Sequence, residues 1–125
     1  MLLTKEQINY LLQTAKIFAD ASQLYTIQTE SLTMMPYIYG KEINDYIKWM
    51  YENELVVQGY STIEKNYLDN YTNDTWYANL TEKEVIKCLA FAIRRDRFVD
   101  GFLIHTITNK SFEKLVNHLK QIHNG

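Results

Sequence analysis

Residues 81–101 read TEKEVIKCLAFAIRRDRFVDG, and this stretch decides the fold. Thr81 is followed three residues later by Glu84, which is the capping-box pattern that starts a helix. The apolar side chains after it recur at helical spacing and make one wide face: Val85, Ile86, Leu89, Ala90, Ala92 and Ile93. Gly101 can adopt the left-handed conformation that ends a helix, or can sit where another helix packs too closely for a side chain. The sequence therefore predicts a central core helix over residues 81–97.

Further helices are expected on both sides of this central helix. Thr4 with Gln7, and Ser61 with Glu64, repeat the capping-box spacing. The predicted apolar faces are Ile8, Leu11, Leu12, Ala15, Phe18 and Ala19 after Thr4; Ile43, Tyr46, Ile47, Met50 and Tyr51 after Gly40; Ile63, Tyr67, Leu68 and Tyr71 within residues 61–71; and Phe112, Leu115, Val116, Leu119 and Ile122 near the C-terminus. A shorter helix over residues 102–107 is expected to lead into a break at residues 108–110.

The connections between these helices contain little predicted strand. Residues 26–40, with Pro36 and Gly40, form the longest expected irregular connection, which can wrap the core through Met34, Met35 and Tyr37. Thr72-Asn73-Asp74 predicts a turn. Residues 55–57 allow at most one short isolated strand, which is too short to establish a sheet. The predicted fold class is all-α or nearly so, a single compact orthogonal array of five to six helices in one domain over residues 1–125.

Composition limits the classes of function. The chain of 125 residues fits one domain, and no apolar run approaches the roughly 20 residues that span a bilayer. Its beginning shows no secretory signal, so we expect a soluble protein in the cytoplasm. Cys88 stands alone among apolar residues and is predicted to be a small buried hydrophobe. A net charge of −2 disfavours broad binding to DNA, although the arginines could form a local basic patch with Lys87, Lys110 and Lys114.

Charge is densest where the central helix ends. The segment contains three guanidinium groups and two carboxylates within eight residues: Arg94, Arg95, Asp96, Arg97, Phe98, Val99, Asp100 and Gly101. On a continuous helix Arg94 and Arg97 share one face, Asp96 and Asp100 share another, and Phe98 would pack inward. The favoured interpretation is structural, with these residues pairing with one another and capping the helix.

Two functional interpretations of this segment stay open. Arg94, Arg95 and Arg97 could grip a carboxylate, a phosphate or an acidic partner surface through bidentate hydrogen bonds, with Tyr67 and Trp76 beside them. Acid–base chemistry by Asp96 or Asp100 is less favoured, because neighbouring arginines lower the pKa of a carboxylate. The tyrosines at positions 60, 67, 71 and 77 could line a groove above the arginines, although core packing is the favoured role of Trp76 and Tyr77.

The same segment resembles a bacterial family, domain of unknown function 6508. In that family an apolar helix leads into an Arg-x-acid-Arg-Phe-x-acid-Gly motif, followed by a break and an apolar final helix, as at Asn109 and after it in this chain. The matching positions of the motif are Arg94, Asp96, Arg97, Phe98, Asp100 and Gly101. The family usually carries glycine after the asparagine of the break, where this chain has Lys110. The resemblance implies an architecture and a motif, and no activity.

Other recognisable chemistry is sparse. His118 and His123 are five apart, which misses the spacing of a helical metal pair, and His105 has no carboxylate at ligand spacing. No phosphate-binding loop or nucleophile elbow is present, so we expect no metal and no cofactor and do not favour an enzyme. The preferred function is a protein-interaction or regulatory module that binds a protein partner or self-associates, and a phage or other mobile element is a candidate source. The alternatives are a small anionic ligand or nucleotide on the arginines and, third, nucleic acid.

Overall fold

Seven helices and one small sheet make up the described part of the chain, which is residues 2–27, 37–58 and 61–124 of a computed structural model. The elements are α1 (Lys5–Asp20), β1 (Tyr25–Ile27), β2 (Tyr37–Tyr39), α2 (Lys41–Glu52), α3 (Ser61–Asn70), α4 (Asp74–Ala78), α5 (Glu82–Asp96), α6 (Phe102–Thr108) and α7 (Ser111–Asn124). The predicted helical fold class is confirmed, with seven helices in place of the expected five to six. Within the described ranges no helix is both long and apolar enough to cross a bilayer.

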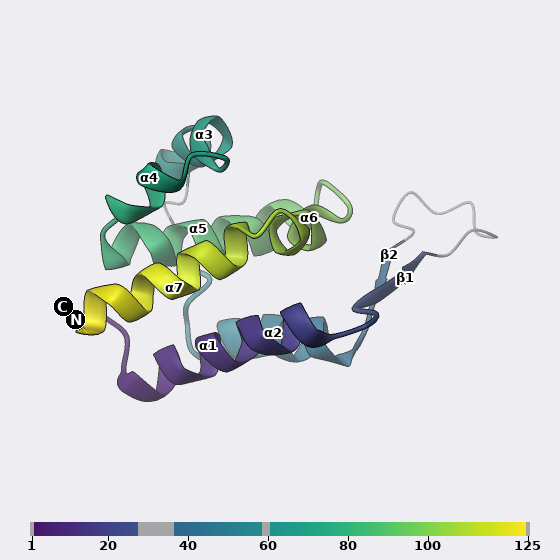
Figure 1. The fold of residues 1–125 in the computed structure, drawn as a ribbon. Coiled ribbons are helices and arrows are strands. Elements are labelled where there is room, and N and C mark those ends of the chain that lie inside the picture. Colours follow the sequence, from purple (N-terminus) through teal and green to yellow (C-terminus); the bar gives the residue numbers. More distant parts are fainter. Residues whose placement is uncertain (1, 28–36, 59–60, 125) are drawn as a thin grey trace.

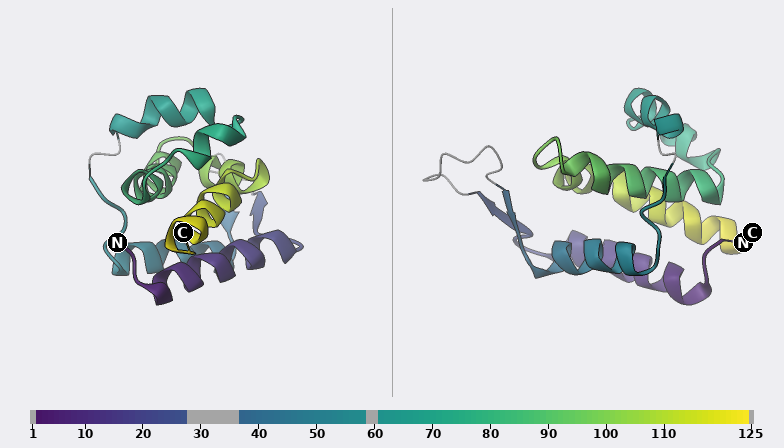
Figure 2. Two further views of the ribbon diagram at one scale, coloured as in Figure 1. Left: turned by 60° about the vertical axis from the view of Figure 1, so that its left-hand side comes forward. Right: turned by 180° about the vertical axis from the view of Figure 1, so that it is seen from behind.

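The helices form layers. Figure 1 shows α1 and α2 side by side in one layer, with α5, α6 and α7 in the next, and α3 and α4 cover the far side of α5 and α7. Strands β1 and β2 join the ends of α1 and α2 and project beyond the helices as a hairpin, as Figure 2 shows from two further directions. The two chain ends lie together at the opposite end of the molecule (Figure 1).

Helix α5 is the centre of the core, as its sequence predicts. Its buried side chains come from every face of the helix: Val85, Ile86, Cys88, Leu89, Ala90, Phe91, Ala92 and Ile93. The capping box at its start is present, because the Glu84 N–H donates to Thr81 Oγ1 at 3.2 Å and the Thr81 N–H donates to Glu84 Oε1 at 3.0 Å. Cys88 is buried as predicted, and burial raises the pKa of its thiol to about 12.

The predicted start of α1 is also confirmed. Thr4 and Gln7 form the reciprocal capping box, and Ile8, Leu11 and Phe18 are buried on the predicted face. Helix α3 occupies the predicted stretch, but the Ser61 side chain lies outside the described residues, so its capping box stays a prediction. Tyr51 and Leu68, predicted on buried faces, are exposed.

Residues 55–57 do not form the short strand that was considered possible. The chain leaves α2 through Glu54, whose φ is 57°, and the Leu55 N–H then donates to the Met50 carbonyl at 2.9 Å. Leu55 is buried in the core, and no strand lies beside it among the described residues. The apolar run therefore marks a helix end that packs inward.

The connection predicted as irregular over residues 26–40 is instead bounded by the two strands. Tyr25 pairs with Tyr39, Thr26 with Ile38, and Ile27 with Tyr37, in antiparallel register. Met34, Met35 and Pro36 lie outside the described residues. A three-residue strand is too short to display the alternation by which strands are recognised in a sequence.

Three turns complete the path around the core. The turn predicted at residues 72–74 is present, but it leads into the unpredicted short helix α4, where Asn73 caps the Thr75 N–H. Gly101 has a φ of 79°, as its predicted left-handed role requires. The predicted break after α6 is also present, and Lys110 has a φ of 71° there. Lys110 therefore adopts the left-handed backbone conformation at the position where the family that the chain resembles usually has glycine.

Candidate functional site

Asp96, at the end of α5, joins two separate segments. Its Oδ1 accepts a hydrogen bond from the Leu103 N–H at 2.9 Å, which anchors the start of α6. The same oxygen accepts from the Tyr39 hydroxyl at 2.5 Å, which ties β2 to the end of α5. Burial and the nearby Asp96 carboxylate raise the pKa of Tyr39, so its hydroxyl is protonated and acts as the donor.

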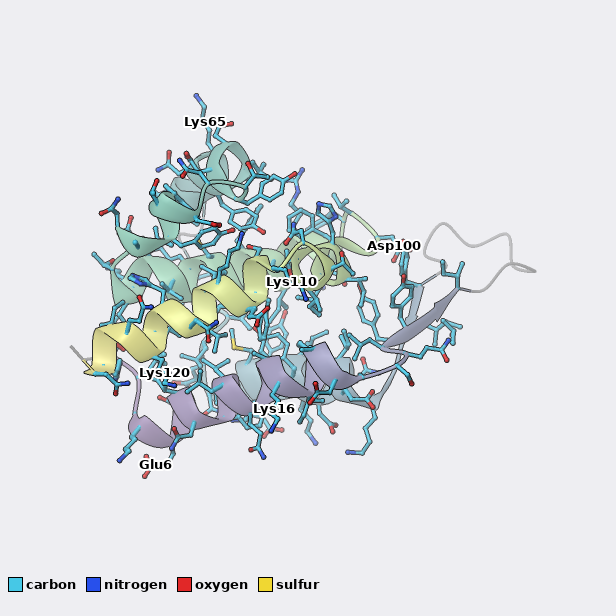
Figure 3. All side chains as sticks on the ribbon, in the orientation of Figure 1. Glu6, Lys16, Lys65, Asp100, Lys110 and Lys120 are labelled. Atoms are coloured by element: carbon cyan, nitrogen blue, oxygen red, sulfur yellow. The ribbon has the colours of Figure 1, made fainter. Side chains whose placement is uncertain are left out.

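Asp100 and Gly101 hold the same strand at a second point. Asp100 Oδ2 accepts from the Tyr37 N–H at 3.2 Å, and Figure 3 shows Asp100 on the turn between α5 and α6, beside the hairpin. A Cβ atom on Gly101 would lie 2.7 Å from the Tyr37 ring, so the glycine permits this close approach. Gly101 therefore combines the predicted left-handed turn with close packing, although the close neighbour is strand β2 and not the predicted helix. The acids and the glycine of the motif form an anchor for the hairpin.

Arg95 pairs with an acid outside the motif. Its Nη1 lies 2.8 Å from Glu64 Oε1, and both side chains are about one-third exposed. The guanidinium also lies 5.8 Å from the centre of the Phe91 ring and 5.6 Å from that of Phe102. These contacts join α3 to α5 and α6, whereas pairing within the motif was the favoured prediction.

Arg94 and Arg97 have different surroundings from Arg95. Arg94 Nη2 donates to the Val56 carbonyl at 3.3 Å, in the connection after α2. Arg97 is exposed and makes no hydrogen bond or ion pair through its side chain with the described part of the chain. The three guanidinium groups therefore point to three environments, and their use on an anion stays a prediction.

Phe98 does not pack inward, so that prediction is wrong. Its side chain is 85% exposed, the largest exposure of any large hydrophobic residue in the described ranges. The helix ends at Asp96, and the Phe98 N–H donates to the Arg95 carbonyl in a turn. Helical spacing from Arg94 therefore no longer determines its direction. The neighbouring Val99 is 41% exposed.

Tyr67 and Trp76 belong to the aromatic packing between α3, α4 and α5. The Tyr67 hydroxyl donates to Ser111 Oγ at 2.8 Å, and both residues are buried. Tyr77, also buried, donates to the Tyr71 carbonyl at 2.7 Å and lies 2.9 Å from the same Ser111 oxygen. Trp76 is half-buried, with its ring edge-on to Tyr67. Tyr67 and Tyr77 therefore do not line an open groove above the arginines.

Two of the three lysines considered for a basic patch, Lys87 and Lys114, make local side-chain contacts. Lys114 pairs with Asp74 at 2.7 Å, and its ammonium lies 5.7 Å from the centre of the Tyr77 ring. Lys87 contacts the Thr62 hydroxyl, whereas Lys110 lies at the turn between α6 and α7, as Figure 3 shows. The continuous cationic stripe required for nucleic-acid binding was a prediction that these contacts do not favour.

A groove that was not predicted lies beside β1. The cavity has a volume of about 720 Å³ and lies between the end of α1, strand β1 and the junction of α6 with α7. Its apolar lining includes Phe18, Leu24, Ile104, Ile107 and Phe112. These residues were predicted as core or left unassigned, because a groove is a property of how three elements meet.

Comparison with known proteins identifies one family. A family model described as "Family of unknown function (DUF6508)" matches residues 3–125. Searches of the curated proteins and of the solved structures find no match. The matched range includes the first helix as well as the motif and the helices after it.

Proposed function

The chain belongs to the DUF6508 family of unknown function over essentially its whole length. We propose that it is a protein-interaction module. The observation that carries the proposal is the 85% exposure of Phe98 within the family motif. Burying such a side chain contributes about 1.5–3 kcal/mol of free energy, and the fold of this chain leaves Phe98 unburied. A partner protein would bury the Phe98 side chain on binding.

The surroundings of Phe98 support a protein partner. The turn that carries it is held in place, because Asp96 and Asp100 on either side bind the hairpin. Ile27 and Ile38 on that hairpin are 52% and 50% exposed. Large apolar side chains on anchored segments at one end of the molecule are typical of binding surfaces, where a few central residues supply most of the affinity. Ile27 pairs with Tyr37 and so shares the sheet face that packs on this turn, whereas Ile38 points to the opposite face. We call Phe98, Val99 and Ile27 the hairpin-end surface.

The test uses the purified chain as bait for its partner, with Phe98→Ser as the test variant and Tyr51→Ser as the matched control. Tyr51 is also exposed, at 45%, but lies on α2 away from this surface. A captured protein is purified and its affinity measured by calorimetry. We expect Phe98→Ser to weaken binding at least about tenfold, as for a hot-spot residue, and Tyr51→Ser to leave binding unchanged.

Thermal unfolding provides the folding control. Phe98→Ser should leave the stability within about 0.5 kcal/mol, because the side chain is on the surface. Equal binding by wild type and Phe98→Ser, or no partner captured by either, contradicts the proposal. Loss of binding in Arg97→Ala with none in Phe98→Ser would instead favour an acidic or anionic ligand on the exposed guanidinium.

A further inference from the structure

The two edges of the hairpin differ in how their backbone groups are used. The Gly40 N–H donates to the Leu24 carbonyl at 2.8 Å, so this pair is a hydrogen-bonded pair of the antiparallel ladder. Hydrogen-bonded and non-hydrogen-bonded pairs alternate along such a ladder. Thr26 and Ile38 therefore bond each other, while the N–H and C=O groups of β1 at positions 25 and 27 point outward from one edge. Those of β2 at positions 37 and 39 point outward from the other.

The outer edge of β2 is occupied by the protein itself. The Tyr37 N–H donates to Asp100 Oδ2, and the Tyr39 carbonyl accepts from Asn44 Nδ2 at 3.0 Å. Within residues 2–27, 37–58 and 61–124, nothing occupies the outer edge of β1. Outside the ladder, the backbone groups of Tyr25 and Ile27 make no hydrogen bond to the described part of the chain. Nothing in the sequence of β1, Tyr-Thr-Ile, protects this edge with a charge or a proline.

The open edge faces the groove. Leu24, Tyr25, Thr26 and Ile27 all line the cavity of about 720 Å³, and no residue of β2 lines it. Successive residues of a strand point their side chains to opposite faces, so a cavity lined by all of them borders the edge of the strand. The opposite wall comes from α6, α7 and the turn between them, and its apolar side chains are Ile104, Ile107 and Phe112.

On this basis we infer that the groove binds an extended peptide segment of the partner protein, which adds to β1 as a third strand. Main-chain hydrogen bonds supply affinity in this mode of recognition, and apolar pockets for alternate side chains supply specificity. Two strands of three residues are marginal by themselves, so a third strand also completes the sheet. The inference rests on the proposed function, since it names how the partner binds.

The lining favours a peptide over a small charged ligand. Lys110 and Glu113 both line the groove and carry opposite charges, so the groove has no net preference for an anion or a cation. Its volume falls within the roughly 300–1,000 Å³ range of binding sites for small molecules and short segments. The expected occupant is therefore a segment with apolar side chains at alternate positions and an uncharged centre.

The probe is a library of random seven-residue peptides displayed on phage, selected on the full chain. The test variant is Ile27→Pro, which removes the outward N–H but leaves the ladder bonds of Thr26 and Ile38 in place. The matched control, Ile27→Ala, keeps the N–H and removes most of the side chain. For a selected synthetic peptide we expect Ile27→Pro to bind at least about tenfold more weakly than Ile27→Ala, so that the difference reports the lost N–H and not the side chain.

Amide hydrogen exchange supplies a direct readout. Adding the selected peptide should slow exchange at the outward amides of Tyr25 and Ile27. The inference is overturned if no peptide is selected, if Ile27→Pro binds the peptide as tightly as Ile27→Ala does, or if the protected amides lie elsewhere. A wild-type dimer that Ile27→Pro converts to a monomer also overturns it, because a second copy of β1 would then be the occupant.

Failure of this inference is distinguishable from failure of the proposed function. Phe98→Ser should leave the affinity for the short peptide unchanged, while it weakens binding of the whole partner. If the peptide binds β1 but partner binding is unaffected by Phe98→Ser, the inference about the groove is supported and the proposal for the hairpin-end surface is contradicted.

Discussion

At the scale of single residues, the hydrogen bond from the Tyr39 hydroxyl to the Asp96 carboxylate is the most specific contact that the motif makes. This bond joins β2 to α5, which are far apart in the sequence. The same oxygen, Asp96 Oδ1, also accepts from the Leu103 N–H. A hydrogen bond to a charged group contributes about 1.5–3 kcal/mol, and more when its loss leaves a partner unsatisfied. The coupling between these residues is therefore measurable.

Tyr39→Phe should lower the free energy of unfolding by about 1–2 kcal/mol, and Asp96→Ala by about 2–4 kcal/mol, because the second change removes both hydrogen bonds. Urea unfolding of the single and double variants gives the coupling energy. In the Asp96→Ala background, Tyr39→Phe should have almost no effect. An equal effect of Tyr39→Phe in both backgrounds would mean that the two groups act independently.

Lys110 is a second informative residue, because it keeps the left-handed φ of 71° at the turn before α7. That conformation costs a residue with a side chain about 1–2 kcal/mol, partly offset by the greater entropy that glycine loses on folding. Lys110→Gly should therefore raise the stability by about 0.5–1 kcal/mol in thermal unfolding. Lys110→Ala, which keeps the strain, should change it little, and a destabilising Lys110→Gly would show that the lysine side chain itself contributes.

At the scale of elements, one of the contacts that hold the hairpin is the close approach of Tyr37 to the turn between α5 and α6. Gly101→Ala places a methyl group 2.7 Å from the Tyr37 ring and forces alanine into a φ of 79°. Together these effects should destabilise the protein by about 2–4 kcal/mol. Tyr37→Leu in the same chain should recover the part due to the collision, as measured by urea unfolding. No recovery would assign the whole effect to the backbone.

The long helices could be predicted from the sequence, whereas the hairpin and helix α4 could not. The capping boxes at Thr4 and Thr81 and the apolar faces of α1, α2, α5 and α7 were sufficient to predict those helices, because each signal is local and repeats over several turns. The hairpin was missed because its strands have three residues each and are recognisable only from their pairing. Helix α4, with five residues, is likewise too short to show a period.

The candidate site was predicted in position and only partly in role. The motif did mark the structurally important turn, since Asp96, Asp100 and Gly101 all contact the hairpin or the next helix. Phe98 was placed wrongly because helical spacing was extended beyond the end of α5. The groove beside β1 was not predicted, because its walls come from three elements whose arrangement is set by tertiary packing.

At the scale of the whole molecule, Glu82 joins the two chain ends opposite the hairpin. Its Oε1 accepts from the N–H groups of Leu2 and Leu3 at 2.9 and 2.6 Å and lies 3.2 Å from His123 Nε2. Burial acts to raise the pKa of Glu82, but the Leu3 N–H, His123 and the Leu2 N–H outweigh it and hold the pKa below its ordinary value. The three segments therefore depend on one ionised carboxylate.

This lowered pKa gives a pH dependence of definite sign. A carboxylate whose pKa is lower in the folded state stabilises the protein above its unfolded pKa of about 4.3, and this stabilisation is lost as the pH falls through the folded value. The melting temperature of wild type should fall more steeply below about pH 5 than that of Glu82→Gln, which cannot titrate. Parallel pH profiles for the two proteins would show that Glu82 does not couple the ends to acid stability.

Asp96 and Asp100 anchor the hairpin, which carries part of the proposed binding surface. The most direct measurement is amide hydrogen exchange by NMR in an Asp96→Ala, Asp100→Ala double variant, with Arg97→Ala as the control. The account predicts at least about tenfold faster exchange at the ladder amides of Thr26 and Ile38, with α1 and α7 still protected and the control like wild type. Unchanged exchange in the hairpin, or an equal loss of protection throughout the helices, would contradict it.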